Sequence, residues 1–315
     1  MSILVYAESW EGKFKKSTFE AASYANQLAK DLNTDTIAVS LGNIDKSELL
    51  KLGEYGVSKI FSYSNITKSD NKNSSIALAN HAKESKAIIF SNTFSAKMIA
   101  PRLSAKLKAG LLSNVISKIL NSNNFTFQRQ AFSSKAIETV TVNTEKVIIT
   151  VSPNAFEVKT NPTNCEITTN DENFENQFSI IGSETNSGKI SLSEAEIVIS
   201  AGRGLKGPEN WGMIEELAEL LNAATACSKP VSDIGWRPHS EHVGQTGKAV
   251  APNLYVAVGI SGAIQHLAGV NSSKVMVAIN TDPEAAFFKA ADYGVIGDAF
   301  DVVPKLIEEI KKIKN

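Results

Sequence analysis

The sequence contains little cysteine and no long apolar run. Only two of its 315 residues are cysteines, Cys165 and Cys227. Two cysteines are too few for a disulfide framework, and these two lack the paired spacing of a zinc knuckle. No apolar run approaches the roughly 18 to 20 residues that a membrane-spanning helix needs. These shortages exclude a disulfide-stapled scaffold and a helical membrane protein.

The sequence also has no large excess of charge of either sign. The 32 basic side chains are balanced by 33 acidic ones, which gives a net charge of -1. Proteins that bind nucleic acid need a basic excess to neutralise phosphates, so we expect no nucleic-acid partner. The chain runs from Met1 and Ser2 directly into the apolar segment Ile3 to Ala7, without a charged leader. We therefore expect a cytoplasmic protein.

Several catalytic motifs are absent. The sequence has no GxSxG elbow, no GxxxxGK[ST] loop, no HExxH pair and no dense acidic cluster. The sequence therefore lacks the residues that a hydrolase, a phosphate-loop nucleotidase or a metalloenzyme would need. His239 and His242 lie three residues apart, but no third ligand is nearby, and we interpret them as loop residues. We expect neither catalytic residues nor a metal site.

The chain predicts two α/β domains, at residues 1–188 and 189–315. In the first, apolar runs predict strands at 3–7, 35–41, 59–63 and 87–91, alternating with helices at 17–32, 46–55, 74–84 and 94–108. This alternation is typical of a parallel sheet. Runs at 115–120, 125–131, 135–142 and 146–151 favour added antiparallel strands. Residues 152–188 are rich in Pro, Asn and Thr and predict a linker.

The second domain resumes the alternation and predicts an open parallel sheet. Strands are expected at 196–201, 254–260, 274–280 and 293–297, and helices at 210–221, 261–268, 283–291 and 302–312. We expect Asp301 to cap the last helix. This domain also holds 12 of the 19 glycines, from Gly202 onward. Because glycine tolerates positive φ and close approach of a ligand, the ligand site is expected here.

Four polar or glycine-containing loops are candidates for that site, at 201–207, 242–248, 259–266 and 278–283. Ligands of open α/β sheets bind at the carboxyl ends of strands, where we expect these loops to gather. Arg203 and free backbone N–H groups suit an anionic group. Each loop could equally be a solvated turn, and Asn280 could simply cap the next helix. The loop at 259–266 is not GxGxxG, because only one glycine lies in its turn and no acidic residue follows at the usual distance, which disfavours a standard dinucleotide site there.

The run from 202 to 298 supports a more specific interpretation. Its segments GRGLK at 202–206, VGQTGKAVAP at 243–252, LYVAVGISGAIQHLAG at 254–269 and INTDPEA at 279–285 closely resemble the electron transfer flavoprotein alpha subunit. The first 190 residues fit the family in length and element order, with LVYAE at 4–8 and PRLSAKL at 101–107 as weaker matches.

This resemblance implies a heterodimer in which the C-terminal domain holds FAD and a beta subunit carries AMP. The complex would pass electrons from flavin dehydrogenases, such as the acyl-CoA dehydrogenases of fatty acid β-oxidation, to a quinone reductase at the membrane. It would be an electron carrier rather than an enzyme in the usual sense. The first domain would supply scaffold and subunit interface. The residues that would contact FAD are Arg203, Ser228, Lys229, Val243, Gly244, Gln245, Thr246, Ser261, Gly262, Ala263, Ile264, Gln265, His266, Asn280, Asp298 and Ala299.

The resemblance also implies individual roles. Arg203 would lie on the phosphate or flavin side, Thr246 at flavin N5 and His266 near the O2 edge, whereas Asn280, Asp298 and Ala299 would surround the adenosine end. One residue departs from the family, because Lys229 stands where arginine is usual. Positive charge is kept, but the planar guanidinium and its forked donors are lost, which puts the flavin reduction potentials in question.

Two other functions stay open. One is the alpha subunit of an electron-bifurcating complex that uses a second FAD and NADH. The other is a nucleotide-binding interaction protein that keeps the fold without flavin.

Overall fold

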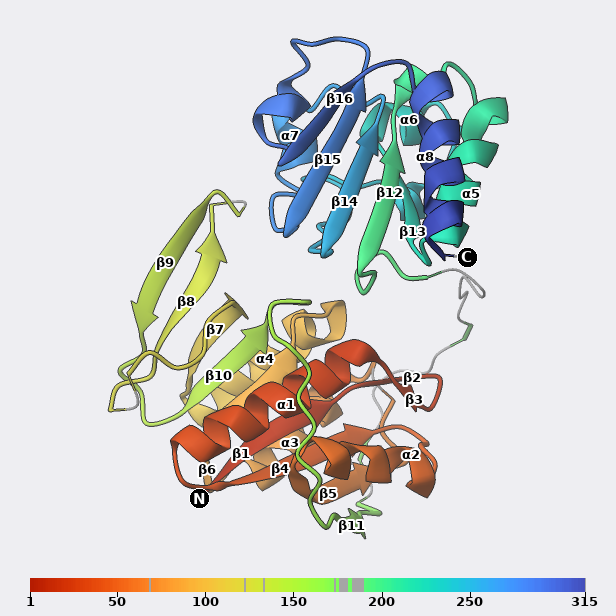
Figure 1. The fold of residues 1–315 in the computed structure, drawn as a ribbon. Helices are drawn as coiled ribbons and strands as arrows, with labels where there is room; N and C mark the ends of the chain where they lie inside the picture. The colour runs from red at the N-terminus through yellow and green to blue at the C-terminus, as the bar shows by residue number, and fades with distance from the viewer. Residues whose placement is uncertain are drawn as a thin grey trace. The chain divides into compact units, whose positions relative to one another are not determined.

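The computed structural model describes residues 1–67, 69–121, 123–132, 134–172, 174–175, 181–182 and 190–314. The chain divides into two compact units, one of residues 1–130 with 137–184 and one of residues 131–136 with 185–315. Each unit is built around its own sheet (Figure 1). Within the described ranges, no helix is both long and apolar enough to cross a membrane.

The first unit contains a nine-stranded sheet of order β11-β5-β4-β1-β6-β10-β7-β8-β9. Pairing is parallel from β11 to β7, and β7 pairs antiparallel with β8. The strands are β1 (Ser2–Ala7), β4 (Asp35–Leu41), β5 (Val57–Tyr63), β6 (Ser85–Ser91), β7 (Gly110–Val115), β8 (Thr126–Ala131), β9 (Ala136–Thr141), β10 (Val147–Val151) and β11 (Glu166–Thr169). A small hairpin joins β2 (Ser9–Trp10) to β3 (Lys13–Phe14). The expected parallel sheet with added antiparallel pairing is confirmed.

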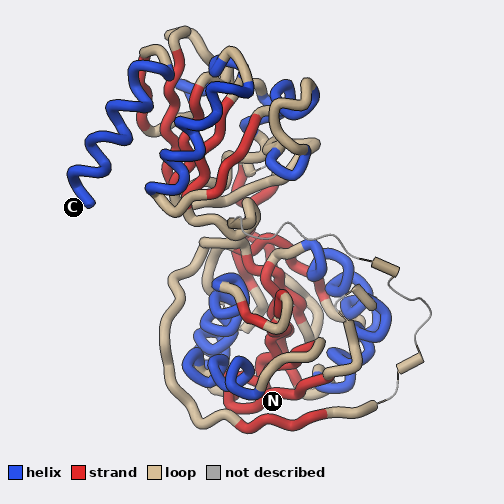
Figure 2. The backbone as a smooth tube through the Cα atoms, turned by 90° about the vertical axis from the view of Figure 1, so that its right-hand side faces the viewer, coloured by secondary structure: helices blue, strands red, loops and turns tan. Residues whose placement is uncertain are grey.

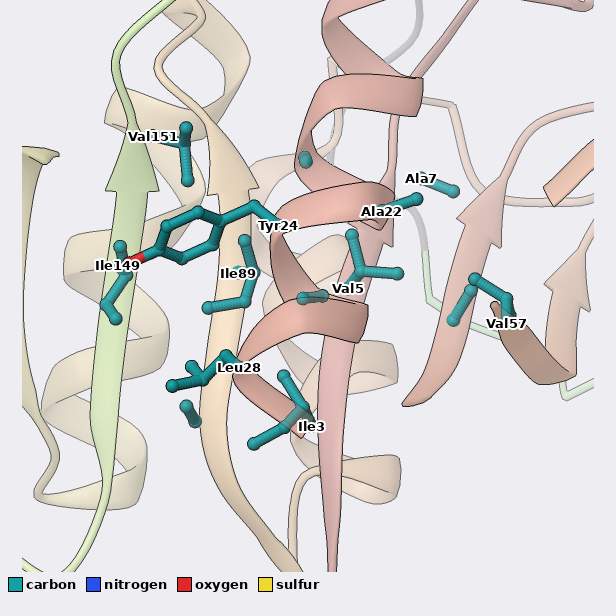
Figure 3. Packing of buried hydrophobic residues seen from close by; sticks show 14 of the residues in the cluster. Ile3, Val5, Ala7, Ala22, Tyr24, Leu28, Val57, Ile89, Ile149 and Val151 are labelled. Carbon is teal, nitrogen blue, oxygen red and sulfur yellow. The ribbon is translucent and has the colours of Figure 1, made fainter. Parts of the chain in front are cut away.

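Helices cover both faces of this sheet (Figure 2). They are α1 (Lys16–Asp31), α2 (Lys46–Leu50) with the 3-10 turn η1 (Lys51–Tyr55), α3 (Asn71–His81) and α4 (Phe94–Leu107). Because neighbouring residues of a strand point to opposite faces, Ile3 and Val5 enter one apolar cluster and Leu4 the other. Figure 3 shows Tyr24 of α1 lying against Ile149 of β10.

Two predicted strands of the first unit were wrong in position or direction. The run 146–151 was expected to pair antiparallel, but β10 lies between β6 and β7 and is parallel to both. All five of its side chains are buried, as is typical of a central parallel strand covered on both faces. The strand expected at 115–120 is instead β7, which ends at Val115.

The predicted linker at 152–188 was also wrong over its first part. Residues 152–165 run from β10 to β11 along the outside of the first unit (Figure 1). The backbone N–H groups of Asn154 and Phe156 donate to the carboxylate of Glu20, at 3.1 and 2.9 Å. Further along, the N–H of Thr163 donates to the carbonyl of Gly53. These bonds hold the segment as a strap, because a Pro- and Asn-rich stretch can satisfy its backbone against a neighbouring helix.

The second unit has a five-stranded, wholly parallel sheet of order β13-β12-β14-β15-β16. The strands are β12 (Ile197–Ala201), β13 (Ala224–Cys227), β14 (Leu254–Val258), β15 (Val275–Asn280) and β16 (Tyr293–Ile296). The helices are α5 (Gly212–Leu220), α6 (Lys229–Asp233), α7 (Ile264–Leu267) and α8 (Ala299–Lys314), with 3-10 turns η2 (Arg203–Leu205), η3 (Pro208–Trp211), η4 (His239–Glu241) and η5 (Ala286–Lys289). The open parallel sheet is confirmed.

Three local expectations in this unit were wrong. Strand β13 was not expected, because its short Ala-Thr-Ala-Cys sequence carries little apolar signal. The helix expected at 261–268 is the four-residue α7, since Gly262 has a φ of +83° that interrupts a helix. Helix α8 begins at Ala299, where the carboxylate of Asp298 accepts the N–H of Phe300 at 3.0 Å, so Asp298 rather than Asp301 caps it.

We predict that Glu20→Ala loosens the strap. Two backbone donors would lose their buried acceptor, at a cost of about 1–3 kcal/mol in the free energy of unfolding. Urea unfolding and limited proteolysis within 152–165 measure the effect. The control is Glu157→Ala, which removes a side chain of the same segment that is 79% exposed. Equal protease resistance in Glu20→Ala and the wild type would contradict the role of Glu20.

Candidate functional site

The candidate site begins where the strands of the second unit end. The chain leaves β12 for β13 on one side of the sheet and then returns to β14 on the other side. The loops after β12 and β14 therefore diverge at a switch point, the usual ligand position in an open α/β sheet. In Figure 1 the arrowheads of β12, β14 and β15 mark this carboxyl edge.

Glycines allow the two loops to touch there. The N–H of Gly202 donates to the carbonyl of Val258 at 2.9 Å, and the N–H of Gly204 donates to that of Gly259 at 3.2 Å. A Cβ on Gly202 would lie 2.3 Å from the Gly259 carbonyl oxygen, and one on Gly259 would lie 2.8 Å from the Cα of Gly204. The absence of a Cβ at these glycines thus allows the backbones of the two loops to pack against each other.

The loop at 242–248 is distant in sequence but reaches the same edge. It follows η4 rather than a strand, and the N–H of Val243 donates to the carbonyl of Cys227, at the end of β13. The N–H of Gln245 donates to the carbonyl of Gln265 at 2.7 Å. A Cβ on Gly269 would lie 2.5 Å from the Cα of Gly244, so these backbones also touch.

His266 is a buried titratable group of the edge. It is 7% exposed, and its Nε2 lies 2.9 Å from the hydroxyl of Tyr255. Within the described part of the chain, its buried Nδ1 has no hydrogen-bond partner. Burial, with a smaller contribution from His242, lowers the pKa of His266 to about 4. The imidazole is therefore neutral near pH 7.

Cationic side chains lie on the exposed part of the edge. Arg203 and Lys229 are both exposed. Lys206 pairs with Asp298 at 3.3 Å and lies over the ring of Phe300. The backbone N–H of Phe300 and the nearby Lys206 ammonium lower the pKa of Asp298. The edge thus presents positive charge, which suits an anionic ligand.

The structure places the predicted residues in three environments. Arg203, Lys229, Gln245, Thr246, Ser261, Ala263, Ile264 and Gln265 are exposed; Ser228, Val243, Gly244, Gly262, His266 and Ala299 are buried; Asn280 and Asp298 are half-buried. Val243 and Ala299 belong to apolar clusters, so only their backbones are available to a ligand. Asn280 donates to the carbonyl of Ile260 and accepts the N–H of Asp282, so it organises the turn after β15. The alternative that it caps the next helix is wrong, because η5 begins at Ala286 and has no side-chain cap.

Sequence reasoning missed a clamp behind this edge. Arg237 donates through Nε and Nη2 to both carboxylate oxygens of Glu241, each at 2.7 Å, and through Nη1 to Glu215 at 2.9 Å. Its guanidinium also lies over the ring of Trp211. These contacts attach the segment before Val243 to η3 and α5. The spacing of four residues between Arg237 and Glu241 could have indicated their ion pair. No sequence pattern shows that Trp211 and Glu215 also lie beside Arg237.

The strand order and the loops at the carboxyl edge define the class of protein. It is a two-unit α/β protein whose second sheet has the ligand position used by flavin- and nucleotide-binding domains. A family model described as the electron transfer flavoprotein FAD-binding domain matches residues 191–271, and one described as the electron transfer flavoprotein domain matches residues 3–173. The first match includes Arg203 and His266 but ends before Asn280.

Full-length relatives agree with these matches. The chain is 35% identical to the electron transfer flavoprotein subunit alpha of Bacillus subtilis (strain 168), covering 99% of this chain and 98% of the relative. It is 36% identical to the corresponding subunit of Syntrophomonas wolfei, covering 98% of both, and 38% identical to a mitochondrial one from Dictyostelium discoideum, covering 92% and 90%. The chain belongs to the electron transfer flavoprotein alpha subunit family.

We predict that Arg237→Lys destabilises the loop at 242–248. Lysine keeps the charge but loses the forked bonds and the contact with Trp211, at a cost of about 1–3 kcal/mol. Thermal unfolding and faster hydrogen exchange at the Val243 amide would report it. The control is Lys311→Ala, which breaks an exposed pair with Glu216 and should change stability by about 1 kcal/mol or less. Unchanged exchange at Val243 in Arg237→Lys would show that the loop does not depend on the clamp.

Proposed function

We propose that this chain binds FAD at the carboxyl edge of its second sheet and works as the alpha subunit of a heterodimeric electron carrier. The observation that carries the proposal is the buried Nδ1 of His266, which has no partner within the described residues. Buried polar atoms in folded proteins nearly always have a hydrogen-bonding partner, and a ligand bound at this edge would supply it.

The residues at this edge fit FAD. Arg203 supplies a guanidinium suited to a pyrophosphate, and it lies in the loop that contacts Gly259. Thr246 is exposed on the loop at 242–248 and Gln265 on α7, and the bond from the Gln245 backbone N–H to the Gln265 carbonyl joins the two segments. Their hydroxyl and amide groups can donate to or accept from the polar edge of a flat ring. Asp298 already caps α8 and pairs with Lys206. If it also contacts the adenosine end of FAD, its carboxylate must make that contact in addition to these two interactions.

When bound, FAD supplies a flavin that takes up electrons and releases them to a second protein. The chain's part is to hold that ring and to set the charge around it. Neutral His266 offers a hydrogen bond without a competing positive charge, whereas exposed Lys229 and Arg203 supply positive charge at the surface. Lys229 acts as a point charge, because it lacks the fork of the arginine that is usual in the family.

We further propose that the partner is an electron transfer flavoprotein beta subunit carrying AMP. Donors would be flavin dehydrogenases, including acyl-CoA dehydrogenases of fatty acid oxidation, and the acceptor a quinone reductase at the membrane. The names of the relatives as alpha subunits support the beta partner. A cytoplasmic location is proposed because both cysteines are free, as in a reducing compartment.

The test is to purify the chain together with its beta subunit, record the visible spectrum and count FAD and AMP per heterodimer. A yellow complex with one FAD and one AMP supports the proposal. Two FAD and reduction by NADH would favour the bifurcating function instead. A colourless complex would overturn the flavin proposal in favour of an interaction protein.

We predict that Thr246→Ala shifts the flavin reduction potential while FAD stays bound. The hydroxyl would contribute one hydrogen bond that changes with reduction, so its loss should alter the reduction equilibrium about two- to tenfold. A redox titration of the purified heterodimer measures this shift. The control is Thr281→Ala, another exposed threonine at the same edge, placed after β15. An unchanged potential in Thr246→Ala would remove Thr246 from contact with the ring.

A further inference from the structure

Three buried rings lie beneath the loops of the candidate site. Tyr255 is the second residue of β14, whereas His266 comes from α7 and Phe287 from η5. Tyr255 and Phe287 are fully buried, and their rings are parallel within 1°, with centroids 6.2 Å apart. The His266 ring is tilted against both, at 6.1 Å from Tyr255 and 5.9 Å from Phe287.

The backbone around these rings is packed tightly. The N–H of Phe287 donates to the carbonyl of Ser261 at 3.1 Å. A Cβ on Gly262 would lie 2.3 Å from the Phe287 nitrogen. The loop that leads into His266 therefore rests directly on η5. This contact, with the two aromatic neighbours, fixes the direction of the imidazole ring.

The hydrogen bond at Nε2 determines which ring nitrogen of His266 carries the proton. Burial raises the pKa of the Tyr255 phenol, so the phenol stays protonated and must donate. Its hydrogen-bond partner within the described residues is Nε2 of His266 at 2.9 Å, since the nearby Ser200 hydroxyl makes no hydrogen bond there. An imidazole nitrogen is a stronger acceptor than a hydroxyl oxygen, so the phenol proton goes to Nε2. In a neutral imidazole with Nε2 as acceptor, the remaining proton lies on Nδ1.

We propose that Tyr255 is a positioning residue that fixes His266 in the Nδ1–H form and so makes the buried Nδ1 a hydrogen-bond donor toward the ligand. The inference rests on the proposed function for the identity of that ligand. A flavin offers carbonyl oxygens and a ring nitrogen that gain negative charge on reduction. A donor at Nδ1 therefore binds the reduced ring more strongly than the oxidised one, and it does so without placing a full positive charge in the core.

The first test is the protonation pattern of the four histidines, His81, His239, His242 and His266, in the purified heterodimer. Nitrogen-15 NMR with labelled histidine distinguishes a protonated ring nitrogen from a bare one, and single His→Gln variants assign the signals. In the wild type, His266 should show a protonated Nδ1 and a bare Nε2 near pH 7. A protonated Nε2 in the wild type would overturn the proposal without any need for a Tyr255 variant.

The second test is Tyr255→Phe, which removes one oxygen and keeps the ring stack. The Nε2–H form of His266 should then rise about two- to tenfold, as expected for the loss of one hydrogen bond. The flavin should become harder to reduce, with a lower potential. The matched control is Tyr63→Phe in the first unit, where the Tyr63 hydroxyl also lies 2.7 Å from a histidine Nε2, that of His81. This control should alter the His81 signals and leave both His266 and the potential unchanged.

These outcomes separate the inference from the proposed function. A colourless heterodimer would end the flavin proposal, yet the Nδ1–H form and its loss in Tyr255→Phe would still establish what Tyr255 does. A yellow heterodimer in which Tyr255→Phe leaves the His266 signals and the potential unchanged would overturn the positioning role and leave FAD binding intact. A fall in potential equal to that in Tyr63→Phe would likewise overturn it.

Discussion

The candidate site depends on close contact between the backbones of loops that follow different strands. Gly202 and Gly204 touch Gly259, and Gly244 touches Gly269, at distances that leave no room for a Cβ. Because these contacts are between main chains, the positions of the loops do not vary with side-chain rotamers. The exposed groups of the edge, such as Thr246, are held on a rigid base as a result. Preorganised donors of this kind bind a ligand without the entropic cost of ordering a loop.

The same edge separates two kinds of electrostatic group. Lys206, Lys229 and Arg203 are exposed, where water screens their charge. His266 is buried and neutral, and it is held by Tyr255 rather than by a carboxylate. A buried charge without a partner would be costly, whereas a neutral donor costs little once a ligand accepts its bond. The exposed positive charges and the buried hydrogen-bonding group of this edge thus belong to different residues.

Much of the fold followed from apolar periodicity. Strands β1, β4 and β14 were placed by their sequence, because apolar runs and βα alternation are strong local signals. Weak local signals gave errors. Strand β13 is short and rich in small residues, and its pairing with β12 identifies it. The segment after Val151 is polar enough to predict a linker, but Glu20 in α1 supplies its acceptor.

The sequence by itself determined the family, the parallel sheets and the set of polar loops, because motifs and periodicity are local properties of the chain. It did not determine which groups those loops meet. The glycine contacts, the clamp of Arg237 on Trp211, the bond between Tyr255 and His266 and the cap at Asp298 join residues from separate elements. Only the tertiary structure decides such pairs, since each depends on the register of the strands and on burial that excludes water.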